Sequence, residues 1–323
     1  MNQKLFYWSG QFTLALRLII GWTYFSAFWR RLILDNKLIQ DEVGYIGEKF
    51  NHFLPHALFI KPIIEYLVSN PELLWYNMVI FTIVEAIVGF CLLLGIWTRF
   101  MSIGVIFLAT GILLGAGWLG TTCLDEWQIG ILGIGGGIAI LFTGGGKYAF
   151  DYWFTKKNIL IPFDKLLTPT SSRYILMISL FALGIALYAN QVFHGGVIGT
   201  LHNKSVKPKL ELKATFNDTN KIGLDIYRTE GADVYGSFLI KILFKSHNGE
   251  IIHSLDQQDL ANFNPQHIKN YYVTKVKADK HSMLIPLGAK ATLTLSVPKE
   301  IKNHINEIVL IDISGAEWST KII

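Results

Sequence analysis

Five long apolar stretches lie within the first 200 residues of this chain. Each stretch has roughly 17–25 residues, and a helix of that length can cross a hydrocarbon core about 30 Å thick. Tryptophans lie at or near many of the ends, and these amphipathic rings favour the headgroup level of a bilayer. We therefore predict membrane-spanning helices at residues 11–29, 73–97, 99–118, 127–143 and 174–193.

Charge is distributed in the same uneven way. In residues 1–200, 24 of 200 positions are Lys, Arg, Asp or Glu (12%), whereas in residues 201–323 the count is 29 of 123 (24%). An ordinary soluble domain is about 25% charged. This contrast excludes a single uniform soluble enzyme and predicts a membrane bundle joined to a soluble domain. No cluster of basic residues indicates a nucleic-acid partner.

The pattern changes near residue 209, where apolar residues begin to alternate with polar ones, as in half-buried strands. Turn residues such as Asn248 and Gly249 separate about seven short runs. The expected fold is an α-helical membrane bundle of four helices plus one anchor helix, followed by an all-β immunoglobulin-like sandwich. The expected divisions are a four-helix domain at 1–155, a cytoplasmic linker at 156–172, an anchor helix at 173–200 and the β-domain at 201–323.

The distribution of Lys and Arg predicts the orientation of the bundle. Five basic residues lie between 144 and 173, whereas the turn at 119–126 has none. The positive-inside rule then places the N-terminus in the cytoplasm and the β-domain in the periplasm or another extracytoplasmic space. We expect a multi-pass protein of the inner (cytoplasmic) membrane. The loop before the second stretch would lie outside, with short helices on the outer membrane face.

Charged residues inside membrane helices are costly, so Arg17 and Glu85 are the first functional candidates. Two interpretations stay open. They could form a proton path or hold the polar head of a quinone, or they could be a buried pair that fixes helix packing. Trp22 and Asp125 complete the set of residues that we expect at a quinone site or along a proton path.

A second group of candidates belongs to the outer ends of the helices. Arg30 and Arg31 offer paired guanidinium groups, which suit a small oxyanion substrate. Cys123 lies in an outer turn, and a thiolate near those arginines could react with sulfur as a catalytic group. The alternative is an incidental thiol, with arginines that anchor lipid headgroups. Cys91 is expected at another depth, too far away for a disulfide.

No pattern in the sequence predicts a resident cofactor. The two cysteines and the scattered histidines give no metal-binding string, and no haem, flavin or iron–sulfur motif is visible. We therefore expect no metal site, and a quinone would act as a diffusible co-substrate. The glycines of the apolar stretches allow close helix packing and would permit a homodimer.

Several segments resemble the DoxX/DoxD membrane family. Residues 85–99, with Glu85, Gly89, Gly95 and Arg99, are similar to the second helix of that family. The string Thr-Thr-Cys-Leu-Asp-Glu-Trp at 121–127 resembles the DoxD subunit specifically, as do residues 25–32, 50–56 and 144–153. From about residue 171 the chain looks like DoxA. It is thus similar to a fusion of the two small subunits of thiosulfate:quinone oxidoreductase.

This resemblance implies an oxidoreductase that joins two thiosulfate ions into tetrathionate and passes two electrons to a membrane quinone. The lipid bilayer, thiosulfate and quinone would be its partners, and the β-domain could bind a partner protein. The residue roles given above rest on placement along the helices, not on family motifs. The alternative function is a non-catalytic membrane scaffold whose outer β-sandwich docks a partner. A transporter of a sulfur compound is a third interpretation.

Overall fold

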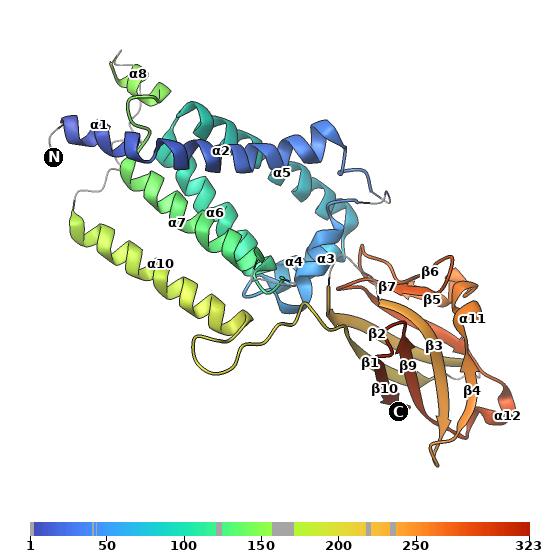
Figure 1. Cartoon of the computed structure of the whole chain (residues 1–323). Helices are drawn as coiled ribbons and strands as arrows, with labels where there is room; N and C mark the ends of the chain where they lie inside the picture. Colours follow the sequence, from blue (N-terminus) through green and yellow to red (C-terminus); the bar gives the residue numbers. More distant parts are fainter. Residues whose placement is uncertain are drawn as a thin grey trace. The chain divides into compact units, whose positions relative to one another are not determined.

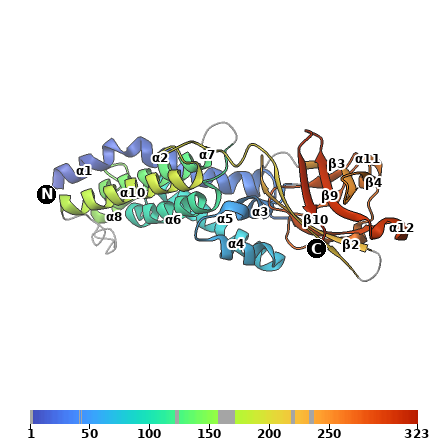
Figure 2. The ribbon, with the colours of Figure 1, turned by 90° about the horizontal axis from the view of Figure 1, so that it is seen from below.

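The computed structural model describes residues 3–40, 42, 44–120, 125–156, 171–217, 221–232 and 237–323. The chain divides into two compact units, shown as ribbons in Figure 1 and Figure 2. We call the first, residues 1–46, 75–118 and 122–202, the helical unit. The second, residues 47–74, 119–121 and 203–323, is the β unit.

The helical unit confirms a membrane bundle. Within the described ranges, four helices are long and apolar enough to cross a membrane: Pro71–Leu94, Thr98–Ala116, Glu126–Thr143 and Ser172–Phe193. They belong to α5 (Pro71–Leu94), α6 (Thr98–Ala116), α7 (Asp125–Thr143) and α10 (Ser172–Phe193). A short α8 (Phe150–Lys156) follows α7.

The first predicted stretch forms two helices in place of one. They are α1 (Gln3–Phe12) and α2 (Leu14–Phe28), and the break falls at Thr13. The Thr13 hydroxyl lies 2.7 Å from that of Thr143, at the end of α7, which fixes the break against another helix. A π-helical turn, η1 (Trp29–Leu34), continues α2.

Glycines position α7 against α6. An added Cβ at Gly130 or Gly133 would lie 2.8 Å from the Cβ of Leu113 or Ala109, respectively. Only a glycine permits such an approach without a shift of the neighbouring helix. The close α6–α7 packing therefore follows directly from the small residues of the fourth apolar stretch.

One end of the bundle is fixed by charged side chains that cap helices. The Asp151 carboxylate accepts hydrogen bonds from the backbone N–H groups of Trp97 and Thr98 at 2.7 and 2.8 Å, at the start of α6. Arg99 Nη1 donates to the carbonyl of Leu141 at 2.9 Å, near the end of α7. An anion at a helix N-terminus and a cation at a C-terminus both complement the helix dipole.

The β unit contains two antiparallel sheets, which confirms the predicted β-sandwich. Their strand orders are β1-β2-β8-β5 and β10-β9-β3-β7-β6, with β4 paired to β3. The strands are β1 (Lys209–Phe216), β2 (Lys221–Glu230), β3 (Ser237–Ser246), β4 (Ile251–Leu255), β5 (Ile268–Asn270), β6 (Lys277–Ala278), β7 (Met283–Ile285), β8 (Lys290–Ser296), β9 (Ile305–Asp312) and β10 (Glu317–Lys321). Short helical elements α11 (Gln257–Ala261), η3 (Pro265–His267) and α12 (Lys299–Lys302) join some of them.

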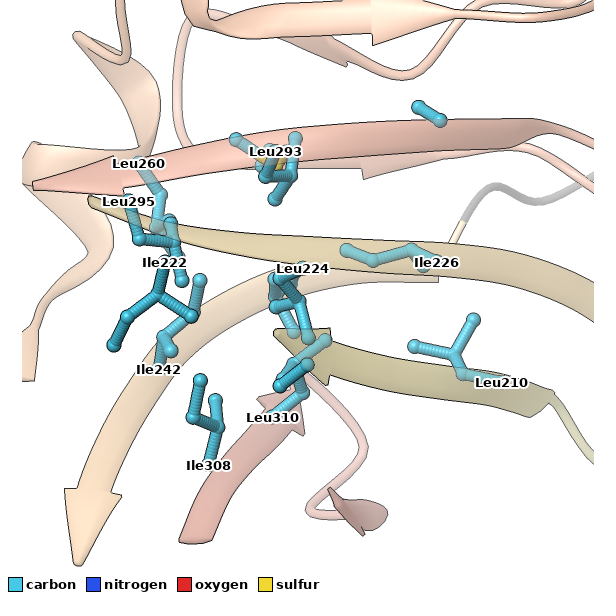
Figure 3. Packing of buried hydrophobic residues seen from close by; sticks show 14 of the residues in the cluster. Leu210, Ile222, Leu224, Ile226, Ile242, Leu260, Leu293, Leu295, Ile308 and Leu310 are labelled. Atoms are coloured by element: carbon cyan, nitrogen blue, oxygen red, sulfur yellow. The ribbon is translucent and has the colours of Figure 1, made fainter. Parts of the chain in front are cut away.

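The core of the β unit is built from the inward-facing residues of both sheets. Alternate positions of β2 and β8, such as Ile222, Leu224, Leu293 and Leu295, are fully buried. Figure 3 shows them packed with Ile242 and other residues of the facing sheet. The period-two pattern of the sequence thus corresponds to one apolar and one solvated face per sheet.

The loop at 47–74 forms α3 (Glu48–Phe53), η2 (Leu54–His56) and α4 (Lys61–Val68), and it packs with the β-sandwich as part of one unit. The amide side chain of Asn51, which is fully buried, donates to the carbonyl of Gly288 at 3.2 Å and accepts from the N–H of Thr274 at 3.1 Å. The N–H of Val273 donates to the carbonyl of Val68 at 3.1 Å. These long-range hydrogen bonds tie the loop helices to the sandwich.

Candidate functional site

A buried ion pair joins η1 to the middle of α5. Nη1 of Arg31 lies 2.5 Å from Oε2 of Glu85, and the same Nη1 donates to the Thr82 hydroxyl at 3.0 Å. The Arg31 and Glu85 side chains are only 12% and 5% exposed. Thr82 donates its own hydrogen to the carbonyl of Met78 at 2.7 Å, so its oxygen is oriented to accept from Arg31. The three side chains form a fixed polar site inside the bundle.

The position of Glu85 along its helix makes this pair unusual. With a rise of 1.5 Å per residue, Glu85 lies about 21 Å from Pro71 and about 14 Å from Leu94 along α5. Each end of the span is therefore at least about 14 Å away from Glu85 along the helix. Two charges at such a depth are costly to desolvate, and they persist only with good mutual geometry.

A close helix crossing brings the pair together. A Cβ on Gly89 would lie 2.3 Å from the backbone nitrogen of Phe25, and a Cβ on Gly21 would lie 2.9 Å from the backbone of α5. The two helices run in opposite directions at this crossing. Moving from Gly21 toward Arg31 on one helix therefore means moving from Gly89 toward Glu85 on the other.

The π-helical turn gives the two consecutive arginines different surroundings. Arg30 is exposed, and its Nε donates to the carbonyl of Ser26 at 3.3 Å, whereas Arg31 is directed to Glu85. A π-turn holds more residues per turn than an α-helix, so it changes the direction of the side chains that it carries. Among the described residues, the hydrogen bonds of Arg30 and Arg31 therefore go to different acceptors, the Ser26 carbonyl and the Glu85 carboxylate.

Arg17 lies away from Glu85. Its Nη1 donates to the carbonyl of Leu92 at 2.9 Å, near the C-terminal end of α5, and its Nη2 donates to the carbonyl of Tyr148 at 2.9 Å. The side chain is fully buried. A guanidinium group that caps a helix C-terminus is a packing device. Of the two interpretations of Arg17, this geometry favours the structural one, with Arg31 as the partner of Glu85.

Exposed aromatic side chains cover the same two helices. Trp22 is 56% exposed, and its ring centroid lies 6.2 Å from that of Phe25. Phe25 in turn contacts Trp29 of η1 and Phe90 of α5, with centroids 6.2 and 5.8 Å away. In a membrane this face meets lipid. We call these four residues the aromatic patch.

The remaining predicted site residues lie beyond this geometry. Cys123 falls outside the described residues. Asp125 begins α7, but its side chain is not among the described ones. In the described parts of the chain, no group of three or more His, Cys, Asp or Glu could hold a metal ion. Thr82 was missed by sequence reasoning, although its position three residues before Glu85 places both on one helix face.

The β unit holds one strongly perturbed histidine. Burial lowers the pKa of His56 to about 4, and the nearby Lys204, Lys61 and Lys209 add to this effect. The carboxylate of Glu230 lies 3.7 Å from Nε2 of His56, which would favour the charged form. However, Glu230 also lies 3.6 Å from Nζ of Lys209, so its charge is already shared. His56 is therefore neutral at physiological pH.

Together, the fold and the site define a multi-helix membrane protein that has a buried ion pair and one β-sandwich domain after its helices. The family model described as TQO small subunit DoxD matches residues 12–178, and the model described as TQO small subunit DoxA matches residues 193–321. The chain belongs to the DoxD family, with the DoxA region fused behind it; TQO denotes thiosulfate:quinone oxidoreductase. No solved structure matches the chain.

Proposed function

We propose that this protein is a membrane thiosulfate:quinone oxidoreductase. Two thiosulfate ions lose one electron each and join through a new sulfur–sulfur bond to form tetrathionate. The two electrons and two protons convert a membrane quinone to quinol. The match to both small-subunit families supports an oxidoreductase of this kind, and the Arg31–Glu85 pair is the observation that carries the assignment of a quinone site.

The chemistry of the pair suits a quinone head. Both hydrogen bonds of the guanidinium leave from Nη1, so within the described residues Nε and Nη2 of Arg31 remain for another acceptor. A quinone carbonyl oxygen is such an acceptor, and its charge grows as electrons arrive. A nearby cation stabilises that developing charge. Glu85 is the group that can exchange a proton with the reduced oxygen, as a general acid does.

The aromatic patch supplies a route for the apolar substrate. Trp22 belongs to it, so we retain Trp22 as a quinone-binding residue. Asp125 stays in the proposal as a residue of a proton path. Arg17, also expected there, would instead hold the end of α5 in place through its hydrogen bonds to the carbonyls of Leu92 and Tyr148. On the sulfur side, we propose Cys123 as the catalytic thiol and Arg30 as a cation that attracts thiosulfate. Arg31, also expected there, would instead serve the quinone.

The proposed setting is the inner membrane, with the N-terminus in the cytoplasm and the β-domain in the periplasm. The proposed divisions are those expected from the sequence, at 1–155, 156–172, 173–200 and 201–323. Quinone is a diffusible co-substrate in this scheme, and no metal, flavin or haem is required. The charge pattern of the loops supports this orientation.

The test uses the purified full-length chain in lipid nanodiscs, with thiosulfate and a short-chain quinone under anaerobic conditions. Quinol and tetrathionate should appear in equal amounts. Glu85→Gln should lower quinol formation by about 100-fold or more, the usual effect of removing a general acid. Glu72→Gln, which changes an exposed acid in the first turn of the same helix, is the matched control and should retain activity.

Two outcomes would decide against parts of the proposal. If the wild-type protein forms no quinol, the redox function fails. If Glu85→Gln is as active as the control, the redox function stands but Glu85 is not the proton donor. A Cys123→Ser variant with full activity would likewise remove the thiol from the mechanism, and the two thiosulfates would then react without it.

One observation favours the alternative function, a scaffold that docks a partner protein. The β unit has a groove of about 770 Å³ between α4 and the solvated face of the β1-β2-β8 sheet. Tyr227, Tyr271 and Tyr272 line it, and such side chains are common in protein-binding surfaces. Co-purification of a stoichiometric partner, together with no bound quinone and no quinol formation, would support this function instead.

A further inference from the structure

Helix α4 has three distinct faces. Its buried face packs within the β unit through Ile64, Leu67 and Val68, which are at most 9% exposed. Its polar face carries Glu65, whose Oε1 accepts a hydrogen bond from the Tyr272 hydroxyl at 2.7 Å. The third face is apolar but exposed. Ile63 and Tyr66 lie on it, 61% and 63% exposed, and Phe59, two residues before the helix, is 72% exposed. We call these three residues the α4 stripe.

The side chains of the α4 stripe stay largely exposed within the β unit. Ile63 and Tyr66 are three residues apart within the helix, so their side chains lie on one side of it. Phe59 lies two residues before the helix begins at Lys61 and has a positive φ of 61°, a conformation that a phenylalanine rarely adopts. A strained residue beside an exposed apolar face points to a functional surface.

The connection of α4 to α5 indicates what covers this stripe. Only Ser69 and Asn70 separate the two helices. Asn70 Nδ2 donates to the carbonyl of Tyr66 at 2.7 Å, and the carbonyl of Asn70 accepts from the N–H of Leu74 at 3.0 Å. One residue therefore closes α4 and opens α5. Because α5 is a candidate membrane span, α4 is only two residues along the chain from a segment that enters the bilayer.

The part of α5 that follows in the sequence also exposes apolar side chains. Tyr76 and Ile80 are 59% and 61% exposed within the candidate span, as expected for residues that face lipid. Tyrosine and phenylalanine are the kinds of side chain found at membrane–water interfaces. The α4 stripe thus has the composition of an interfacial segment and is close in sequence to a membrane span.

We propose that the α4 stripe inserts into the headgroup region of the lipid bilayer and fastens the β unit to the membrane surface. The occupant of the exposed face is lipid, not a protein. The polar face of α4 then stays in water beside the tyrosine-lined groove. This inference rests on the membrane span of α5 and is independent of the proposed redox reaction.

The experiment measures the accessibility of spin labels in the full-length protein in nanodiscs. The chain carries Cys91→Ala and Cys123→Ser, and single labels are placed by Ile63→Cys or Tyr66→Cys. Oxygen, which concentrates in lipid, should reach both stripe positions severalfold better than a water-soluble nickel complex does. Matched controls are Lys61→Cys, an exposed position on another face of α4, and Ile251→Cys, which is 59% exposed on β4. At these controls the nickel complex should be the better relaxing agent.

Two results would overturn the proposal. Equal access of the nickel complex to stripe and control positions would show that the stripe faces water. Poor access of both reagents at positions 63 and 66 would show a protein contact instead. If the cysteine variants do not fold, a photoreactive benzophenone residue at position 66 in the natural background replaces them. Crosslinks to lipid are then expected, and crosslinks only to protein, or none, would refute the insertion.

Discussion

Removal of Arg31 should destabilise the bundle far more than removal of an exposed cation. In Arg31→Met the Glu85 carboxylate, only 5% exposed, loses its cationic partner, while the substituted side chain keeps most of its length. A buried charge left without its partner typically costs about 3–5 kcal/mol. Glu85→Gln leaves an amide oxygen that can still accept from Arg31, so we expect a smaller loss of about 1–3 kcal/mol.

The double variant separates the pair energy from the effects of the single changes. With both charges absent, no ion is left buried and unpaired, so the double variant should be more stable than the sum of the single losses implies. We expect a coupling energy of about 2 kcal/mol, within the range seen for residues in one salt-bridge network. The assay is reversible unfolding of the purified chain by a denaturing detergent, followed by circular dichroism.

A natural control lies a few residues away. Lys37 Nζ is 4.0 Å from Oδ2 of Asp35, but these side chains are 43% and 73% exposed. Exposed pairs contribute little, so Lys37→Met should cost less than about 1 kcal/mol. The reasoning is refuted if Arg31→Met costs no more than Lys37→Met. It is equally refuted if the two single losses add within about 0.5 kcal/mol, because the pair would then carry no interaction energy.

Three further predictions concern particular residues. Gly288→Ala should lower the unfolding temperature more than Gly249→Ala: both have positive φ, but only at Gly288 would the Cβ lie 1.8 Å from the Asn51 carbonyl oxygen, whereas nothing lies within 4 Å at Gly249. Gly89→Ala should separate α2 from α5 and lower both stability and quinol formation, while Gly111→Ala, which has open space, should not. The folded state holds His56 neutral, so the contribution of His56 to the free energy of unfolding should be fully present above pH 6.5. The free energy of unfolding should then fall by up to about 3 kcal/mol as the pH drops toward 4. His56→Gln should remove this dependence in unfolding curves measured across that range.

The membrane bundle and the β-sandwich were predictable because each depends on a local pattern. Apolar stretches of the length of α5 or α10 indicate spans without any knowledge of their neighbours. Alternation in β2 and β8 likewise indicates strands with one buried face. The break at Thr13 was not predictable, because it depends on a hydrogen bond to Thr143, which is 130 residues away.

The partner of Glu85 could not be derived from depth alone. Counting along straight helices places both Arg17 and Glu85 within the membrane, but it does not show which way either side chain points. The structure directs Arg17 to backbone carbonyls and Arg31, through the π-turn, to Glu85. Side-chain direction depends on the crossing at Gly89 and on the local helix type, and neither has a clear signal in residue periodicity.

Residues 47–74 belong to the β unit, but the ribosome makes them long before the rest of that unit. This segment lies within the DoxD match, yet its packing partner begins at residue 203, within the DoxA match. At usual synthesis rates the ribosome needs on the order of 10 s to make the intervening residues. During that interval residues 47–74 have no β-sandwich surface to pack against, because the strands have not yet been synthesised. In a fused chain that surface arrives tethered, at a high effective concentration, whereas two separate subunits would have to find each other by diffusion in the membrane.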